Sequence, residues 1–341
     1  MIGIIMAGGI GTRFWPLSKP ECPKQYLSLF GKRSMIQMTY DRLRPIAREV
    51  YVVTSADQAH LVQQHLPELG ERHVIVEPFG RNTAPCVALS AAWLQSHGVP
   101  ENEAMLVVAA DHRIGKVEEF HRVARQAEQL AARGYLVTFG IVPTYPATGY
   151  GYIESGSGVG NGMFHVKQFK EKPDRETAES FLARGGFYWN SGMFVWLLGT
   201  ILSAYEQHMP EVNELLGEIT QRWQQDGFDT DIASIYDRMP RVPVDIGIME
   251  RAENCAVVPA CIDWSDVGGW QALYDLAPKD DQANAGAGPR TALDATGCYV
   301  RAQKPVALVG VHDLVIVETD DAILVCRRDQ SERVKELAAK R

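Results

Sequence analysis

Short apolar runs and amphipathic segments alternate through the first 141 residues of the chain. The apolar runs contain few polar positions, which is typical of strands buried on both faces of a parallel sheet. The segments between them space their apolar residues as helices do. The runs predict strands at residues 2–7, 50–54, 73–77, 104–110 and 135–141. The segments predict helices at residues 34–43, 57–66, from 83 onward with Thr83 as cap, and 117–132. This order predicts an α/β fold with a doubly wound, mostly parallel sheet.

The pattern changes after residue 141. A glycine-rich β-hairpin is predicted within residues 151–169, and the elements after it are a helix at 174–184, an aromatic strand at 187–196, mostly helical chain at 202–239 and a strand at 255–260. Residues 278–290 (PKDDQANAGAGPR) have the composition of a linker. Short β runs then precede a charged helix at Asp329–Lys340. We therefore expect a large domain at residues 1–277, a linker at 278–290 and a small β-rich C-terminal domain at 291–341.

Length, charge and cysteine content narrow the possible functions. The chain has 341 residues, which suffice for a large core and two domains, and a formal net charge of −8. A general nucleic-acid binder is normally basic, so the charge argues against that class but not against a small anionic ligand. The six cysteines are dispersed without metal-type spacing, which indicates free thiols in a reducing compartment. No basic leader and no membrane-length apolar run is present, so we expect a cytoplasmic location.

Three glycines, Gly8, Gly9 and Gly11, follow the first predicted strand, and two cations, Arg13 and Lys24, come after them. Ligands of open parallel sheets bind beyond the carboxyl ends of the strands. Glycines allow the backbone to approach a phosphate or a base, and an arginine matches phosphate oxygens. The dinucleotide fingerprint lacks its third glycine here, and the P-loop lacks its Ser or Thr because Arg33 follows Gly31 and Lys32. A plain glycine turn stays an alternative at this point.

Seven motifs in order carry a family resemblance. The stretch AGGIGTRFWPLS followed by PKQ resembles the signature of sugar nucleotidylyltransferases, and its FWPLS form resembles the mannose-1-phosphate guanylyltransferase branch. Six further motifs of that family follow along the chain: EPFGRNTAP, ADH, TGYGYIE, FKEKP, WNSGMF and WSDVGGW. Together they cover about four-fifths of the chain, so we identify a resemblance to this family.

The resemblance implies a Rossmann-like nucleotidyltransferase domain and a small C-terminal domain like a left-handed β-helix. The implied reaction joins GTP and mannose 1-phosphate into GDP-mannose and releases pyrophosphate. It further implies a GTP-dependent enzyme in a homodimer that uses Mg²⁺, with subunit contacts through the C-terminal domain. Relatives often carry a fused isomerase domain, and we expect the single-activity form here.

The implied chemistry needs positive charge more than a base, because the attacking phosphate oxygen is already an anion. By resemblance, Arg13 and Lys24 hold the triphosphate, and Arg13 stabilises the leaving pyrophosphate. Asp111 and Asp266 converge on one Mg²⁺ that bridges the phosphates, a site with few protein ligands as magnesium prefers. Taken singly, Asp111 could instead cap a helix and Asp266 could be an ordinary turn residue.

The remaining site residues also rest on the resemblance. Lys172 grips the sugar phosphate, and the residues expected around the sugar are Gly151, Glu171, Asn190, Ser191 and Asp245. The nucleotide-binding set comprises Gly8, Gly9, Gly11, Thr12, Arg13, Lys24, Arg81, Asn82 and Asp111. Within it, Gly8 and Gly9 address the base through main-chain groups, and Arg81 and Asn82 complete its recognition. His112 orients the Asp111 loop.

Several residues depart from the family pattern, and these departures leave alternative substrates and functions open. Ala109, Pro243, Ile246 and Gly269 stand where the family usually has other residues. The changes beside Asp245 leave heptose or fucose 1-phosphate as alternative sugars. A regulatory paralogue that binds nucleotide sugar without turnover is another alternative, although Arg13, Lys24, Asp111, Lys172 and Asp266 are all present. A nicotinamide-dependent oxidoreductase is disfavoured by the missing third glycine.

Overall fold

The computed structural model describes residues 1–9 and 11–338, and the chain within them forms two compact units. The first, the sheet unit, comprises residues 1–8, 37–110 and 114–264. The second, the β-helix unit, comprises residue 9, residues 11–36 and 111–113, and the chain from 265 onward. Helix α1 (Met35–Leu43), strand β5 (Arg113–Ile114) and strand β11 (Trp264–Ser265) lie where the chain passes from one unit to the other. The last two residues of the helix expected at Asp329–Lys340 lie outside the described residues.

In the described chain, nine strands of the sheet unit form one sheet in the order β3-β2-β1-β4-β9-β6-β10-β8-β7. Their bounds are β1 Ile2–Met6, β2 Glu49–Ser55, β3 Val74–Glu77, β4 Ala104–Ala109, β6 Leu136–Ile141, β7 Tyr152–Gly160, β8 Met163–Lys170, β9 Phe187–Leu197 and β10 Cys255–Ala260. Strands β1 to β4 run parallel, as do β6 and β10, whereas β9 is antiparallel to β4 and β6. The mostly parallel sheet expected from the apolar runs is confirmed.

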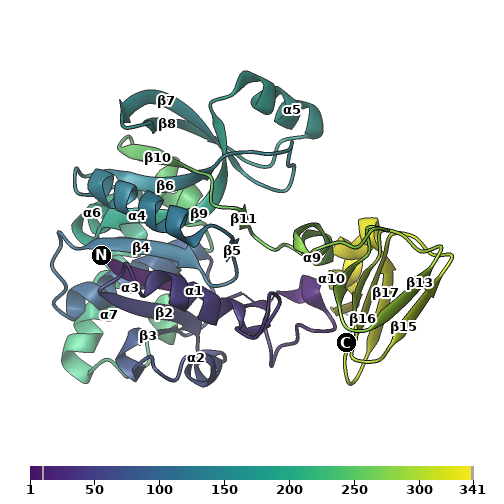
Figure 1. Cartoon of the computed structure of the whole chain (residues 1–341). Helices are drawn as coiled ribbons and strands as arrows, with labels where there is room; N and C mark the ends of the chain where they lie inside the picture. The colour runs from purple at the N-terminus through teal and green to yellow at the C-terminus, as the bar shows by residue number, and fades with distance from the viewer. Residues whose placement is uncertain (10, 339–341) are drawn as a thin grey trace. The chain divides into compact units, whose positions relative to one another are not determined.

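Helices cover both faces of this sheet (Figure 1). Ile2 and Ile4 of β1 belong to one buried cluster with α3, α6 and α7, whereas the alternate residue Gly3 lies against Leu43 of α1. Helix α4 packs on β6, β9 and β10, and the His121 ring of α4 hydrogen bonds the Arg42 carbonyl of α1 at 2.8 Å. The helix bounds are α2 Ala59–His65, α3 Thr83–Ser96, α4 Val117–Ala131, α5 Arg175–Arg184, α6 Leu198–His208, α7 Pro210–Asp226 and α8 Ala233–Tyr236.

The cap of α3 differs from the sequence expectation. Asn82, not Thr83, is the N-cap, and the Asn82 side-chain oxygen accepts a hydrogen bond from the Thr83 amide at 2.8 Å. Asn82 has a φ of 75°, a conformation that asparagine tolerates better than the β-branched threonine. The assignment of Thr83 as cap was therefore wrong by one residue, while Pro85 lies in the first turn as expected.

The C-terminal part of the β-helix unit is built from short coils. Strands β12 (Ala285–Ala287), β14 (Tyr299–Arg301) and β16 (Leu314–Glu318) pair in parallel, and β17 (Ile323–Arg327) closes that sheet. Strands β13 (Arg290–Leu293) and β15 (Val306–Val309) form a second parallel pair. Successive strands therefore alternate between two sheets, which is the arrangement of a β-helix. Strand β12 falls within residues 278–290, where the sequence indicated a linker.

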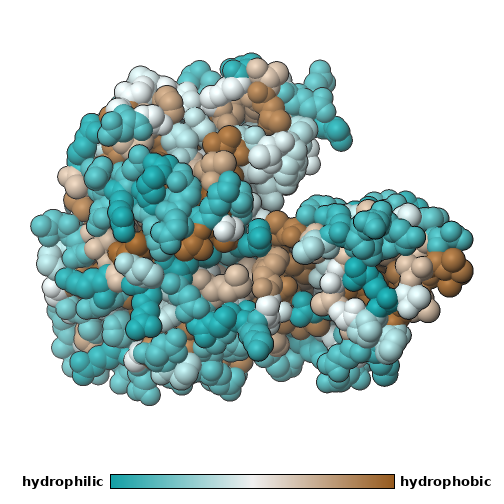
Figure 2. Space-filling model, viewed as in Figure 1, coloured by the Kyte–Doolittle hydropathy of each residue, from teal (hydrophilic) through white to brown (hydrophobic). Residues whose placement is uncertain are grey.

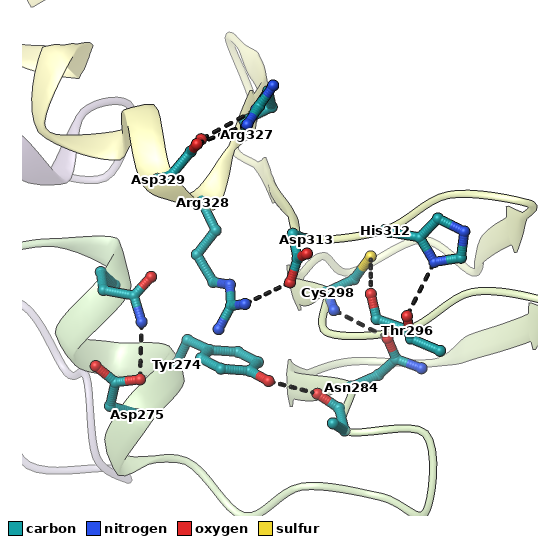
Figure 3. A network of polar contacts seen from close by, with 12 residues as sticks. Tyr274, Asp275, Asn284, Thr296, Cys298, His312, Asp313, Arg327, Arg328 and Asp329 are labelled. Carbon is teal, nitrogen blue, oxygen red and sulfur yellow. Dashed lines mark hydrogen bonds and ion pairs between the residues drawn. The ribbon is translucent and has the colours of Figure 1, made fainter.

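A polar network fastens the segment that leads into the last helix to the rest of this unit (Figure 3). Helix α9 (Trp270–Leu276) supplies Tyr274, whose hydroxyl donates to the Ala283 carbonyl at 2.9 Å. The Arg328 guanidinium lies 3.8 Å from the centroid of the Tyr274 ring and also pairs with Asp313. Arg328 begins the 3₁₀ helix η5 (Arg328–Arg333), which leads directly into α10 (Val334–Ala338). The segment that leads into the last helix is thus held by charged and aromatic contacts.

Candidate active site

The glycine loop leads from β1 into two 3₁₀ turns, η1 (Thr12–Phe14) and η2 (Lys24–Tyr26). Gly11 has a φ of 65°, and a Cβ there would lie 2.3 Å from the Lys24 Cβ and 3.0 Å from the Lys24 amide nitrogen. Real side chains do not tolerate such approaches, so only glycine fits this position. Gly9 is different, because nothing lies within 4 Å of the Cβ that it would carry. Gly11 therefore allows the two turns to pack together, and Gly9 leaves its backbone accessible.

Lys24 is a buried cation with specific partners. Its side chain is 7% exposed, and Nζ donates to Oδ2 of Asp111 at 2.8 Å and to the main-chain oxygen of Asp266 at 2.5 Å. The neighbouring Gln25 side chain donates to the Gly9 carbonyl at 2.8 Å and ties the glycine loop to η2. An ammonium group has three N–H donors, so Lys24 retains one for a ligand after these two bonds.

Asp111 follows β4 along the chain and has an altered proton affinity. Burial alone would raise the pKa of the Asp111 carboxyl, but attraction to Lys24 and His112 and a hydrogen bond from Lys24 bring it below its usual value. Asp111 is therefore ionised at neutral pH. A carboxylate beside a fixed cation is suited to binding a hard metal ion through its second oxygen.

Asp266 is presented by a strained turn. Val267 has a φ of 48°, an unusual conformation for a β-branched residue, and its side chain is fully buried. Gly268 follows so closely that a Cβ there would lie 3.1 Å from Asp266 Oδ2. The burial of Val267 holds the turn in place and thereby fixes the position of Asp266.

These residues line one cavity of about 380 Å³ within the β-helix unit. Its walls include Gly11, Thr12, Arg13, Lys24, Asp111, His112 and Asp266, together with Lys335 of α10. Among the described residues, no cluster of three or more His, Cys, Asp or Glu side chains could hold a metal. The two carboxylates fit a magnesium ion, which usually keeps several waters and takes only one or two carboxylates plus substrate phosphates. Asp111 and Asp266 therefore line the same cavity, and their convergence on one Mg²⁺ stays a prediction.

The residues expected to read the base have partners of their own in the sheet unit. The Arg81 guanidinium pairs with Asp237 and donates to the Met239 carbonyl at 3.4 Å. The Asn82 side chain caps α3, as described above. Both side chains are thus engaged by the protein. A Cβ on Gly8 would lie 3.6 Å from the Glu77 carboxyl oxygen Oε1.

Four of the residues expected around the sugar lie together in the sheet unit. The Asn190 amide donates to Asp245 Oδ1 at 2.7 Å. A Cβ on Gly151 would lie 3.3 Å from Glu171 Oε2 and 3.7 Å from the Asn190 Cβ. Burial raises the pKa of Asp245, the Asn190 hydrogen bond opposes that change, and the Glu171 charge adds to it. Gly151, Glu171, Asn190 and Asp245 therefore form a polar cluster.

Lys172 and Ser191 stand apart from that cluster in different ways. The Lys172 ammonium pairs with Glu171 at 2.9 Å, and both side chains are exposed. Ser191 is 2% exposed; its hydroxyl donates to the Phe139 carbonyl at 2.7 Å and accepts from the Met193 amide at 3.2 Å. The Ser191 hydroxyl is thus engaged by main-chain groups next to a register shift between β6 and β9, whereas the Asn190 amide bonds Asp245. Contact of Ser191 with the sugar stays a prediction.

The comparison with protein families decides the class. A family model described as "Nucleotidyl transferase" matches residues 2–283, which is more than half of the chain. The chain belongs to the nucleotidyl transferase family. A second model, described as "MannoseP isomerase/GMP-like beta-helix domain", matches residues 288–340. The predictions of a nucleotidyltransferase, of its α/β fold and of a β-helix-like C-terminal domain are confirmed.

Known members of the nucleotidyl transferase family resemble the chain along most of its length. Proteins named mannose-1-phosphate guanylyltransferase from Klebsiella pneumoniae and Escherichia coli are each 42% identical to it over 98% of this chain and 72% of their own length. A crystal structure described as mannose-1-phosphate geranyltransferase from Thermus thermophilus has a TM-score of 0.90 and 31% identity, covering 99% of this chain and 98% of that one.

Two further observations concern the use of metal ions in the family and the possibility of membrane-spanning helices. The family generally uses a divalent metal ion, which agrees with the two cavity carboxylates. In the part of the chain that the structure describes, no helix is long and apolar enough to cross a membrane.

Two further residues of interest were absent from the sequence-based set. Glu77 is buried, and its carboxyl accepts hydrogen bonds from Tyr236 and Cys86; burial raises the pKa of Glu77 more than these bonds lower it. Its position at the end of β3, close to Gly8 after β1, was the signal that could have identified it. The second is Lys335, on the last helix, for which the sequence offers no motif.

Proposed function

We propose that the chain is a mannose-1-phosphate guanylyltransferase that converts GTP and α-D-mannose 1-phosphate into GDP-mannose and pyrophosphate. The observation that carries this proposal is the cavity in which Arg13, Lys24, Asp111 and Asp266 meet. The names of the two relatives that are 42% identical over 98% of the chain support the choice of nucleotide and sugar.

The proposed mechanism is an in-line attack by a sugar phosphate oxygen on the α-phosphate of GTP. The nucleophile is already anionic, so the barrier arises from bringing two polyanions together and from the charge on the leaving pyrophosphate. Lys24 offers its third N–H to the triphosphate while Asp111 and the Asp266 carbonyl fix its direction. Arg13, whose fork matches phosphate oxygens, stabilises the pyrophosphate as it leaves.

In this proposal, Asp111 and Asp266 are the residues that would bind a Mg²⁺ ion. When bound, it neutralises phosphate charge and orients the phosphates. The carboxylates of Asp111 and Asp266 would hold the ion, and the Lys24 ammonium keeps Asp111 ionised and in place.

The sugar phosphate is bound by the polar cluster of the sheet unit and by Lys172. Asp245 and Asn190, held together at 2.7 Å, accept and donate hydrogen bonds to sugar hydroxyls. Gly151 leaves room for the sugar ring, and Glu171 adds a further acceptor. Lys172 exchanges its exposed pair with Glu171 for the sugar phosphate, which costs little because exposed ion pairs are weak.

A pyrophosphate-release assay tests this function. We expect the purified chain to give its highest kcat/KM with GTP and mannose 1-phosphate when four nucleoside triphosphates are combined with mannose, glucose, fucose and heptose 1-phosphates. Pro243 and Ile246, which flank Asp245, differ from the residues that the family usually has there. This difference favours fucose or heptose 1-phosphate as the second candidate sugar. Higher turnover with either sugar would reject mannose, and no pyrophosphate release with any pair would reject the enzyme.

We further propose a cytoplasmic homodimer. All six cysteines are free, as expected in a reducing compartment. Apolar side chains emerge from the β-helix strands, with Ile323 67% and Val325 59% exposed on the edge strand β17 and Leu293 and Val309 exposed on β13 and β15. Figure 2 shows brown patches on this domain among hydrophilic neighbours. Such patches favour association with a second copy, since isolated proteins rarely leave strand edges apolar.

A further inference from the structure

The cavity proposed to bind the triphosphate, described above with a volume of about 380 Å³, has one wall that comes from helix α10. Lys335 of α10 lines it beside Arg13, Lys24, Asp111 and Asp266. Three cations, the buried Lys24 and the exposed Arg13 and Lys335, therefore line the cavity with two carboxylates, which gives these five side chains an excess of positive charge before any metal binds. Lys24 is paired with Asp111, but among residues 1–9 and 11–338 neither Arg13 nor Lys335 has an ion pair. Unpaired cations in a cavity are suited to an anionic ligand.

Lys335 is held at this place by its neighbours rather than by chance. Val334, the residue before it, is 3% exposed and belongs to one buried cluster with Phe14 and Trp270. Phe14, in turn, follows Arg13 directly. The same apolar cluster thus fixes the residue next to each unpaired cation, and packing of α10 against η1 sets their separation.

The segment before α10 is fastened as well. Arg328 lies on the Tyr274 ring and pairs with Asp313, as Figure 3 shows. Elsewhere on the coils, the Arg301 guanidinium donates to the Ser28 carbonyl of the loop after η2 at 2.9 Å. The helix that carries Lys335 and the loops that carry Arg13 and Lys24 are therefore joined in one unit through several contacts.

We propose that Lys335 is a third phosphate-binding cation of the nucleotide site, supplied by the C-terminal β-helix domain. This rests on the proposed function for the identity of the nucleotide, but the binding chemistry is that of any linear polyphosphate. The ammonium of Lys335 contacts phosphate oxygens as a point charge on a flexible stem. The β-helix domain thereby completes the substrate site in addition to any role in association.

The test measures binding of inorganic tripolyphosphate to the full chain by calorimetry, in the presence of MgCl₂. We expect Lys335→Ala to weaken binding about tenfold, as loss of one charge-assisted contact does, and Lys335→Arg to remain within about threefold of the unchanged protein. The matched control is Arg333→Ala, which removes a cation from the same exposed segment, where Arg333 pairs with Glu336 at 3.2 Å. It should leave tripolyphosphate affinity unchanged.

Enzyme kinetics separate this inference from the function on which it rests. With GTP and mannose 1-phosphate, Lys335→Ala should raise the KM for GTP about tenfold and leave the KM for the sugar phosphate unchanged. Equal tripolyphosphate affinity of Lys335→Ala and the unchanged protein would overturn the inference, as would failure of the unchanged protein to bind tripolyphosphate at millimolar concentration. Lysine-dependent tripolyphosphate binding without pyrophosphate release from any substrate pair would uphold the inference and reject the proposed function.

Discussion

Gly11→Ala should damage both the stability and the activity of the protein. The new Cβ would lie 2.3 Å from the Lys24 Cβ, so η2 must move by more than 1 Å to restore ordinary contact at about 3.6 Å. The φ of 65° adds a backbone cost of about 1–2 kcal/mol for any residue other than glycine. Overpacking of this kind costs about 1–3 kcal/mol more, so we expect a total loss of about 2–5 kcal/mol in unfolding free energy.

The loss of kcat/KM in Gly11→Ala should be larger than partial unfolding of the variant would cause. A displaced Lys24 cannot keep both its 2.8 Å bond to Asp111 and its 2.5 Å bond to the Asp266 carbonyl. Misplacement of a catalytic group by about 1 Å costs roughly a hundredfold in rate, so kcat/KM in the pyrophosphate-release assay should fall at least that far. Unfolding in urea, followed by fluorescence, measures the loss of stability on the same samples.

The control for Gly11→Ala is Gly98→Ala. Gly98 has a φ of 76° but nothing lies within 4 Å of the Cβ it would carry, so it shares the backbone strain without the collision. We expect this control to lose about 1 kcal/mol of unfolding free energy and no activity. If Gly11→Ala matched Gly98→Ala in both measurements, the close packing of the glycine loop on Lys24 would play no part in catalysis, and our account of the loop would be refuted.

Three further predictions concern single residues and a surface. Asp111→Asn should reduce kcat about 10²–10³-fold and raise the Mg²⁺ concentration needed for half-maximal rate, whereas Asp263→Asn, at an exposed pair, should change neither. Ser191→Ala should cost about 1–3 kcal/mol in unfolding free energy by leaving two main-chain groups unsatisfied, yet leave the KM for the sugar phosphate unchanged; a raised KM would return Ser191 to the sugar site. Ile323→Lys combined with Val325→Lys should shift the chain from dimer to monomer in sedimentation analysis, and an unchanged dimer would place the subunit contact elsewhere.

Acid should affect the site through Asp111. Because its pKa is lowered in the folded protein, its contribution to stability is complete above the unfolded value and is lost as the pH falls through the folded value, below about pH 4. In Lys24→Met the cation is gone, so burial should raise the Asp111 pKa above its unfolded value. The folded protein then takes up the proton more readily than the unfolded chain, so acid should stabilise this variant at Asp111 instead of destabilising it. A pH series of urea unfolding compares the two; identical acid limbs would show that Lys24 does not set the proton affinity of Asp111.

The parallel sheet was predictable because its strands are continuous apolar runs. Ile2, Ile4 and Ile5 of β1 are fully buried, and that pattern has one common structural solution. The β-helix coil at residues 285–287 was not, because its core includes a polar residue. Asn284 is fully buried and bonds the Ala295 carbonyl and the Cys298 amide. In the sequence, however, a polar residue among glycines and prolines is typical of a linker.

The sequence motifs predicted single residues of the candidate site, but not how residues distant in the chain come together. The WNSGMF motif names both Asn190 and Ser191, but it does not show that the Ser191 hydroxyl is buried and bonds the Phe139 carbonyl. The meeting of Asp111 with Asp266 came from resemblance, because no spacing rule relates two residues so far apart in the chain. Neither a local sequence rule nor the family resemblance identified Lys335, because an exposed lysine on a short helix has no distinguishing pattern. Only tertiary packing shows that it lines the cavity.

The packing of the β-helix unit explains why the nucleotide residues and the C-terminal domain should be considered together. Phe14, beside Arg13, contacts the Trp270 ring edge-on at 5.2 Å, and Trp270 packs on Tyr299 of β14 at 5.9 Å. Val267, which holds the Asp266 turn, belongs to the same buried cluster. Aromatic contacts of this kind transmit the position of one element to the next, because close-packed cores deform little. The β-helix core is therefore part of what positions Arg13 and Asp266, although the family models divide the sequence between residues 283 and 288.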